Sequence, residues 1–156
     1  MKTLFVAINA KYIHTNLAVR YMHELAKQNG YTSTEIAEYT INQRMPQLLR
    51  ELYLTKADHK IFSCYIWNID IILDLCCQLK QVMPDTKLLL AGPEVSYNST
   101  EIMEQYTFID GIIRGEGEAA LIPLLKHLQS KTPAASVPSF TYRIGQHIAE
   151  TEQASP

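Results

Sequence analysis

The sequence has no run of lysine or arginine and no long apolar stretch. Its 14 basic and 16 acidic residues leave a formal charge of −2, so no basic track is available to follow a nucleic-acid backbone and no nucleic-acid partner is expected. The short apolar run near the N-terminus gives way at once to charged and polar residues, which fits neither a signal peptide nor a membrane span. We therefore expect a cytoplasmic protein with no membrane partner.

Cysteine is scarce, and the three cysteines match neither a disulfide framework nor a spaced zinc or iron–sulfur ligand set. Cys76 and Cys77 are adjacent within an apolar helical pattern, which is typical of small buried side chains. Cys64 ends a predicted strand. A small-molecule enzyme that uses Cys64 as its nucleophile remains one hypothesis, and it requires a base such as His14 nearby to ionise the thiol.

The glycine patterns of the common nucleotide-binding folds are also missing. Segment 9–16, which follows the first predicted strand, contains no glycine, and this excludes the G-x-G-x-x-G fingerprint of a dinucleotide site. Thr15 alone cannot make the Ser/Thr-rich phosphate loop of a flavodoxin-type FMN site. Asn9 and Cys64 stand where a phospho-receiver domain carries acidic residues.

Apolar runs and amphipathic stretches alternate along the 156 residues, a pattern that indicates a parallel sheet covered by helices. A chain of this length can bury roughly 70% of the surface that its unfolded form exposes, so one compact core is expected. The predicted fold is a flavodoxin-like, doubly wound α/β domain with a five-stranded parallel sheet in the order 2-1-3-4-5. The predicted strands span 3–9, 32–40, 60–65, 87–92 and 108–115, and the predicted helices 16–30, 45–57, 69–84, 99–106 and 118–130.

The composition changes after these five units. Residues 1–130 form the predicted α/β domain. Residues 131–156 begin with proline, serine and alanine and end in a pattern typical of a short β-hairpin that turns at Gly145 and Gln146. We interpret this tail as a linker and hairpin.

Ligands of doubly wound sheets bind beyond the carboxyl ends of the strands, so the loops after strands one, three, four and five should form one rim. These loops carry four large aromatic residues, Tyr12, Tyr65, Trp67 and Tyr97. Aromatic rings there suit a broad, flat, largely apolar ligand held by stacking and a few polar contacts. The alternative is that the rings cap the core beneath the loops.

The loop after the fifth strand reads "RGEGE", in which Gly115 and Gly117 alternate with Glu116 and Glu118. A glycine-rich strand-to-helix turn usually binds phosphate, but two acids there disfavour an anion. They suit a ligand that offers hydroxyl or amide donors. The alternative is that both acids only stabilise the first helical turn.

Four motifs in this order, "NAKYIHTNLAVRYM", "FSCYIWNID", "LAGPEVSY" and "RGEGE", resemble the N-terminal cobalamin-binding domain of B12-dependent radical S-adenosylmethionine (SAM) proteins. The resemblance covers about residues 1–130. The family that the chain resembles includes methyltransferases and the cyclases that act on magnesium-protoporphyrin monomethyl ester. It implies a module that binds a corrinoid for a larger enzyme and does not catalyse a reaction alone. A domain of the same fold that serves only structure or interaction and binds no corrinoid is the alternative.

The resemblance also implies which residues contact the cofactor. A corrinoid is a wide ring fringed with amides and carries a nucleotide tail with ribose hydroxyls, which suit carboxylate acceptors. Glycines let the backbone approach it closely. The implied cofactor-binding residues are Asn9, Tyr12, His14, Cys64, Tyr65, Trp67, Gly92, Pro93, Glu94, Val95, Gly115, Glu116, Gly117 and Glu118.

Two motifs of the wider family are missing. Cobalamin domains that supply a lower cobalt ligand carry D-x-H-x-x-G, whereas this chain has His14 without the aspartate and glycine. His14 is therefore either a cobalt ligand or a histidine that hydrogen-bonds locally at a helix start. The C-x-x-x-C-x-x-C motif of radical SAM domains is absent as well, so we expect the 4Fe-4S cluster and S-adenosylmethionine in a downstream domain outside these residues.

Overall fold

The computed structural model describes residues 1–11 and 16–155. Strands and helices alternate along most of the chain. The strands are β1 (Thr3–Asn9), β2 (Thr34–Thr40), β3 (His59–Ser63), β4 (Lys87–Ala91), β5 (Gly111–Ile113), β6 (Phe140–Ile144) and β7 (His147–Glu150). The helices are α1 (Leu17–Gln28), α2 (Met45–Leu54), α3 (Ile69–Val82), α4 (Ser99–Gln105) and α5 (Glu118–Leu128), with short 3-10 turns η1 (Pro93–Val95) and η2 (Ala134–Ser136).

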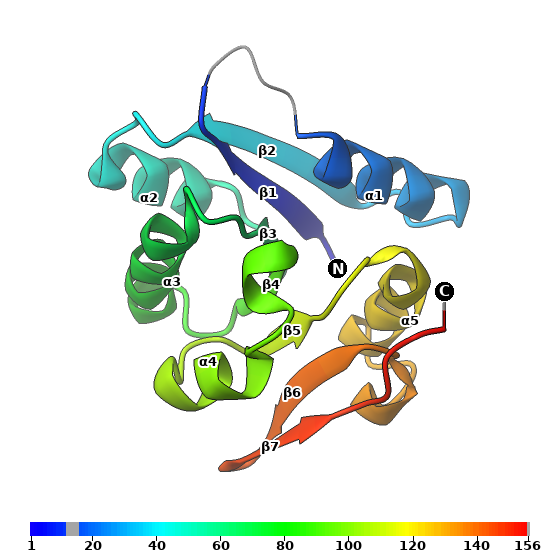
Figure 1. The fold of residues 1–156 in the computed structure, drawn as a ribbon. Coiled ribbons are helices and arrows are strands. Elements are labelled where there is room, and N and C mark those ends of the chain that lie inside the picture. Colours follow the sequence, from blue (N-terminus) through cyan, green and yellow to red (C-terminus); the bar gives the residue numbers. More distant parts are fainter. Residues whose placement is uncertain (12–15, 156) are drawn as a thin grey trace.

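All strands belong to one sheet in the order β2-β1-β3-β4-β5-β6-β7 (Figure 1). The first five are parallel, which confirms the predicted order 2-1-3-4-5. The predicted hairpin forms too, and its turn lies at Gly145 and Gln146 between β6 and β7. It extends the same sheet, because β6 pairs antiparallel with β5.

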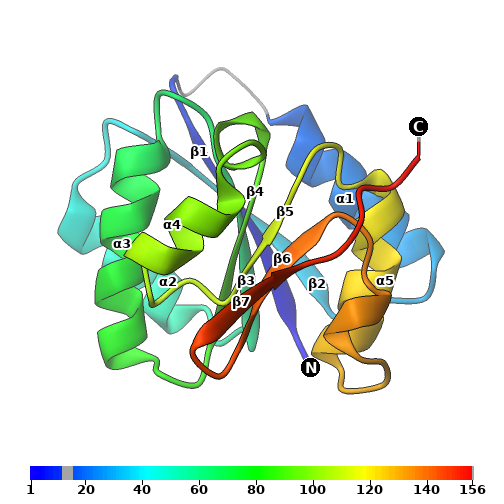
Figure 2. The ribbon, with the colours of Figure 1, turned by 60° about the horizontal axis from the view of Figure 1, so that its bottom comes forward.

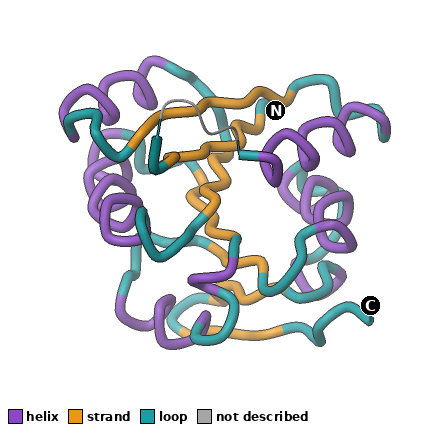
Figure 3. Tube along the Cα trace, turned by 45° about the horizontal axis from the view of Figure 1, so that its top comes forward, coloured by secondary structure: helices purple, strands orange, loops and turns teal. Residues whose placement is uncertain are grey.

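Helices cover both faces of the sheet. Helices α2, α3 and α4 lie on one face and α1 and α5 on the other, as Figure 2 shows with the sheet between them. Figure 3 shows the same layering along the Cα trace. Successive strand side chains point to opposite faces. Along β1, Leu4, Val6 and Ile8 therefore pack in the core under α2 to α4, and Phe5 and Ala7 in the core under α1 and α5.

Local chemistry explains several element ends. Asn16 precedes α1, and its side chain accepts a hydrogen bond from the Val19 backbone N–H, as an N-cap residue does. Pro123 lies inside α5, beyond its first turn, so its missing N–H leaves one hydrogen bond of the helix unmade. Strand β5 is shorter than predicted, because pairing with β4 involves only Gly111 and Ile112.

The C-terminal segment returns to the carboxyl end of the sheet. The Ser139 backbone N–H donates to the Glu152 carbonyl at 2.8 Å, and the Ala154 N–H donates to the Ser139 hydroxyl at 2.8 Å. A Cβ atom on Gly115 would lie 3.0 Å from the Gln153 side chain. Residues 151–154 therefore pack beside the turn that follows β5.

Across residues 1–11 and 16–155, none of the helices combines the length and the apolar character that crossing a membrane requires.

Candidate cofactor-binding site

A cavity of about 470 Å³ opens at the carboxyl ends of the central strands, on the face that α1 and α5 cover. Strands β1, β3 and β4, helix α1 and the loops after β3, β4 and β5 all contribute. The lining residues are Phe5, Ala18, Val19, Tyr21, Met22, Ile61, Ser63, Tyr65, Ala91, Gly92, Pro93, Ser96, Tyr97, Gly115, Glu116, Gly117 and Glu118.

The floor of the cavity comes from strand residues that share one face of the sheet. Phe5, Ile61 and Ala91 belong to the core under α1 and α5 and are apolar. Ser63 follows Ile61 by two residues and therefore points to the same side. The floor is thus apolar, with one hydroxyl group at the end of β3.

Helix α1 forms one wall, with Ala18, Val19 and Met22 lining the cavity. Met22 approaches the turn before α5 so closely that a Cβ atom on Gly117 would lie 2.7 Å from the Met22 Cε atom. A larger residue at 117 would push Met22 aside. The glycine therefore allows helix α1 to close the cavity against the turn.

Ser96 joins the loops after β4 and β5. Its hydroxyl donates to the Gly92 carbonyl at 2.8 Å and accepts from the Gly115 backbone N–H at 2.9 Å. Two loops that are far apart in the sequence are thereby held at one rim.

A hydrogen bond across the cavity mouth joins α1 to α5. The Tyr21 hydroxyl donates to the Glu118 carboxylate, and both side chains line the cavity. This hydrogen bond, with smaller contributions from desolvation and the Glu118 charge, raises the pKa of Tyr21. The tyrosine therefore stays protonated as a donor, and the second Glu118 oxygen is left to accept from a ligand.

Gly92 has a local reason to be glycine. Its φ of +108° is one that L side chains rarely adopt, and a Cβ atom would lie 2.4 Å from the Cys64 carbonyl oxygen. The loop after β4 can cross the end of β3 only because this Cβ is missing.

The structure brings seven of the predicted site residues together around the cavity. They are Tyr65, Gly92, Pro93, Gly115, Glu116, Gly117 and Glu118. Two others, Tyr12 and His14, lie outside the described residues. The remaining five, Asn9, Cys64, Trp67, Glu94 and Val95, lie at the same end of the sheet but do not line the cavity.

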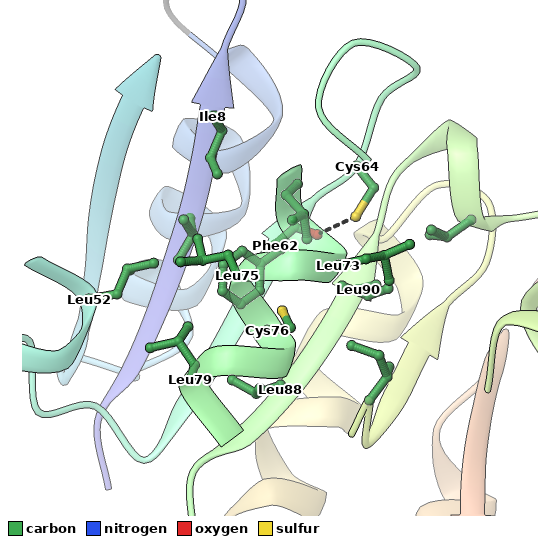
Figure 4. Close-up of a cluster of buried hydrophobic side chains, with 14 of the residues drawn as sticks. Ile8, Leu52, Phe62, Cys64, Leu73, Leu75, Cys76, Leu79, Leu88 and Leu90 are labelled. Atoms are coloured by element: carbon green, nitrogen blue, oxygen red, sulfur yellow. Dashed lines mark hydrogen bonds between the residues drawn. The ribbon is translucent and has the colours of Figure 1, made fainter. Parts of the chain in front are cut away.

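Cys64 and Val95 are core residues on the opposite face of the sheet, under α2 to α4. Figure 4 shows the Cys64 thiol, which donates to the Phe62 carbonyl at 3.6 Å, among buried apolar side chains. Burial raises the pKa of Cys64 strongly and also that of Cys76. A buried thiol that resists ionisation is a poor nucleophile, and this thiol faces the core and not the cavity, which disfavours Cys64 as a nucleophile.

Trp67 stacks on the ring of Tyr65, with 4.5 Å between centroids and 3° between planes. Tyr65 lines the cavity. Trp67 does not line it, and its side chain is 47% exposed. Asn9 does not line the cavity either. Its backbone carbonyl accepts a hydrogen bond from the Ile41 N–H at 2.9 Å. The side chain of Glu94 is exposed.

The buried side chain of Asn68 fixes the loop that carries this aromatic pair. Its amide nitrogen donates to the Ile8 carbonyl at 2.9 Å and the Ser63 carbonyl at 3.1 Å, and its oxygen accepts from the Tyr65 N–H at 2.8 Å. Asn68 thereby ties the ends of β1 and β3 to the cavity wall.

The sequence interpretation missed Ser63, Ser96 and the lining residues of α1. Strand alternation could have identified Ser63, because Ile61, Ser63 and Tyr65 must share a face once β3 is assigned. The α1 residues depend on how the helix packs over the sheet, and Ser96 depends on contact between two loops, so neither has a local signal.

Residues 3–125 match the model of the B12 binding domain. The chain is 28% identical over 93 residues to the cobalamin-dependent radical SAM methyltransferase TokK of Streptomyces tokunonensis, covering 59% of this chain and 14% of that protein. It is 24% identical over 143 residues to the anaerobic magnesium-protoporphyrin IX monomethyl ester cyclase of Cereibacter sphaeroides, covering 87% and 23%.

Solved structures show the same fold. The cobalamin-dependent radical enzyme OxsB, with aqua-cobalamin and S-adenosylmethionine bound, has a TM-score of 0.80 at 13% identity and covers all of this chain and 23% of its own. The radical SAM methyltransferase TsrM of Kitasatospora setae, with cobalamin and a 4Fe-4S cluster, gives 0.75 at 13% identity over 99% and 30%. The chain spans less than a third of each of these relatives.

The family match over residues 3–125, on a fold with a cavity at the carboxyl ends of its strands, shows that the chain belongs to the B12-binding domain family.

Proposed function

We propose that this chain is the cobalamin-binding module of a larger radical SAM enzyme and that the cavity under α1 receives part of the cofactor. The observation that carries the proposal is the cavity itself. It lies where doubly wound folds bind ligands, and it combines an apolar floor with polar groups at its mouth.

The size of the cavity fits one portion of a corrinoid. A volume of about 470 Å³ lies within the range of about 300–1,000 Å³ that small-molecule sites occupy. A benzimidazole base with its ribose needs a space of that order, while the whole cofactor is several times larger. The base would therefore enter the cavity, and the corrin ring would lie across the rim that Tyr65, Gly92 and Tyr97 form.

The polar groups also fit a nucleoside. Ser63 places one hydroxyl on the floor, and Glu116 and Glu118 line the mouth near the turn after β5. Carboxylates accept hydrogen bonds from ribose hydroxyls or corrin amides. This explains why an acidic turn occupies a place where other folds bind phosphate.

Bound cobalamin supplies a cobalt centre that carries a methyl group or an electron. The residues of this chain hold and orient the cofactor, and we expect no catalysis from the chain alone. In the proposed enzyme, a downstream radical SAM domain binds S-adenosylmethionine and the 4Fe-4S cluster and faces the corrin. The relatives suggest methyl transfer or related radical chemistry. Whether His14 ligates cobalt is tested by the Co(II) electron paramagnetic resonance spectrum, since nitrogen splitting must disappear in His14→Ala if it does.

A cytoplasmic location belongs to the same proposal. It is supported by the three cysteines, all of which are free thiols, as is usual in a reducing compartment. The net charge of −2 lacks the basic excess that nucleic-acid binding needs, which supports a set of partners without nucleic acid.

Gel filtration of the purified chain with hydroxocobalamin tests the proposed function. The protein peak should carry the visible absorbance of one corrinoid per chain, and the fluorescence of Trp67, the one tryptophan, should be quenched. A colourless protein peak with unchanged fluorescence would instead support a domain that binds no corrinoid.

A further inference from the structure

We propose that the cavity selects corrinoids by the base of their nucleotide tail, called the lower base, and prefers an apolar benzimidazole to adenine. This inference rests on the proposed function, because it presumes that a corrinoid binds and that its base enters the cavity.

The interior of the cavity offers very few polar partners. The lining side chains of β1, β4 and the buried side of α1, with Ile61 of β3, are Phe5, Val19, Met22, Ile61 and Ala91, none of which is a good hydrogen-bond donor or acceptor. Ser63 contributes the one hydroxyl on the floor. The other polar lining side chains belong to the exposed side of α1, to the loops and to the start of α5: Tyr21, Tyr65, Ser96, Tyr97, Glu116 and Glu118.

The backbone of the floor is also committed. Phe5 lies in the register of β1 with both β2 and β3, and Ile61 lies in the register of β3 with both β1 and β4. The Ala91 carbonyl accepts from the Cys64 N–H at 2.7 Å. Backbone groups in a filled ladder are not free to recognise a base.

Two kinds of lower base make different demands on such a wall. A dimethylbenzimidazole that is not bound to cobalt exposes one ring nitrogen and two methyl groups, so a single hydroxyl can satisfy it. Adenine brings an exocyclic amine and additional ring nitrogens. Against Phe5, Ile61 and Met22 these groups lose their water without gaining partners, which is costly.

The acids at the mouth fix the orientation of the nucleoside. Glu116 lies in the turn before α5 and Glu118 is the first residue of α5; both line the cavity, and Tyr21 already occupies one Glu118 oxygen. Ribose hydroxyls are drawn to these carboxylates, and the base is then directed toward the apolar floor. Its edge meets Val19 and Met22 of α1.

Equilibrium dialysis against three corrinoids tests the inference. The ligands are hydroxocobalamin, the corresponding adenine cobamide, and cobinamide, which lacks the nucleotide. We expect hydroxocobalamin to bind roughly tenfold to a hundredfold more tightly than the adenine form, the range set by one unpaired buried polar group. Cobinamide should also bind more weakly than hydroxocobalamin, and bound hydroxocobalamin should show the absorbance of a base released from cobalt.

The outcomes separate the two proposals. Equal binding of hydroxocobalamin and the adenine cobamide would overturn base selection but leave cobalamin binding intact. Equal binding of hydroxocobalamin and cobinamide would overturn entry of the base into the cavity. Failure of all three corrinoids to bind would overturn the proposed function, and base selection with it.

Met22→Gln provides a second test, because it adds an amide to the wall at nearly constant size. The preference for hydroxocobalamin over the adenine cobamide should fall at least threefold. Met83→Gln is the matched control, since Met83 is also partly exposed but packs on the α2 to α4 face, and its preference should equal that of wild type. An unchanged preference in a folded Met22→Gln protein, checked by thermal unfolding, would contradict the inference.

Discussion

Gly92 shows how a single missing atom shapes the cavity rim. Replacing it with alanine forces a Cβ to within 2.4 Å of the Cys64 carbonyl oxygen while the backbone keeps a φ of +108°. With ψ at 172°, this backbone conformation is essentially limited to glycine, and holding alanine in it costs about 1–3 kcal/mol. The overpacking costs about 1–3 kcal/mol more. Gly92→Ala should therefore lower the free energy of unfolding by about 3 kcal/mol, measured by urea denaturation.

Gly30→Ala is the control for Gly92→Ala. Gly30 also has a positive φ, +88°, but a Cβ there would meet nothing within 4 Å. It should show only the dihedral cost of about 1 kcal/mol. Equal losses in the two variants would mean that the contact with Cys64 does not constrain Gly92.

At the same scale, local sequence patterns predict some of the residues that line the cavity and miss others. Glycine and glutamate in the turn after β5 have a visible pattern, and all four line the cavity. The position of Cys64 at the end of β3 suggests a site residue, but alternation along β3 sends its side chain into the opposite core and leaves Ser63 facing the cavity.

At the scale of elements, the loop between β3 and α3 depends on Asn68. Asn68→Ala removes three hydrogen bonds, to Ile8, Ser63 and Tyr65. Neutral hydrogen bonds contribute about 1 kcal/mol each, so we expect the free energy of unfolding to fall by about 3 kcal/mol. Trp67 fluorescence should shift to longer wavelength as its stack on Tyr65 loosens.

Asn98→Ala is the matched control for Asn68→Ala. Both asparagines precede a helix without a side-chain capping bond, but Asn98 is exposed, and its loss should change stability by less than about 0.5 kcal/mol. If Asn68→Ala were as mild as Asn98→Ala, the loop would be held by other contacts.

The order of the elements was predictable because their periodicities are strong. Strand β1 was predicted with its observed bounds, and the parallel order 2-1-3-4-5 and the final hairpin are confirmed. The sequence did not indicate that β6 would pair with β5 and lengthen the sheet. That pairing joins distant segments, and short-range patterns carry no information about it.

At the scale of the molecule, the two faces of the sheet have different roles. The face under α2, α3 and α4 packs in an apolar core that includes Cys64 and Val95. The face under α1 and α5 holds the cavity at its carboxyl end, and residues 151–154 return beside the same rim. The described residues of the predicted site therefore lie at the end of the sheet where the cavity opens, and we expect a cofactor to enter from the face under α1 and α5.

Filling the cavity tests most directly the claim that a corrinoid binds on the face under α1 and α5. Ala18 lines the cavity from an exposed position on α1, so Ala18→Trp should occupy it without disturbing the core. Leu54→Trp is the control, because Leu54 is 60% exposed at the end of α2, on the other face. In equilibrium dialysis, Ala18→Trp should bind hydroxocobalamin at least tenfold more weakly than wild type, and Leu54→Trp should match wild type. Wild-type affinity in a folded Ala18→Trp protein would contradict the account.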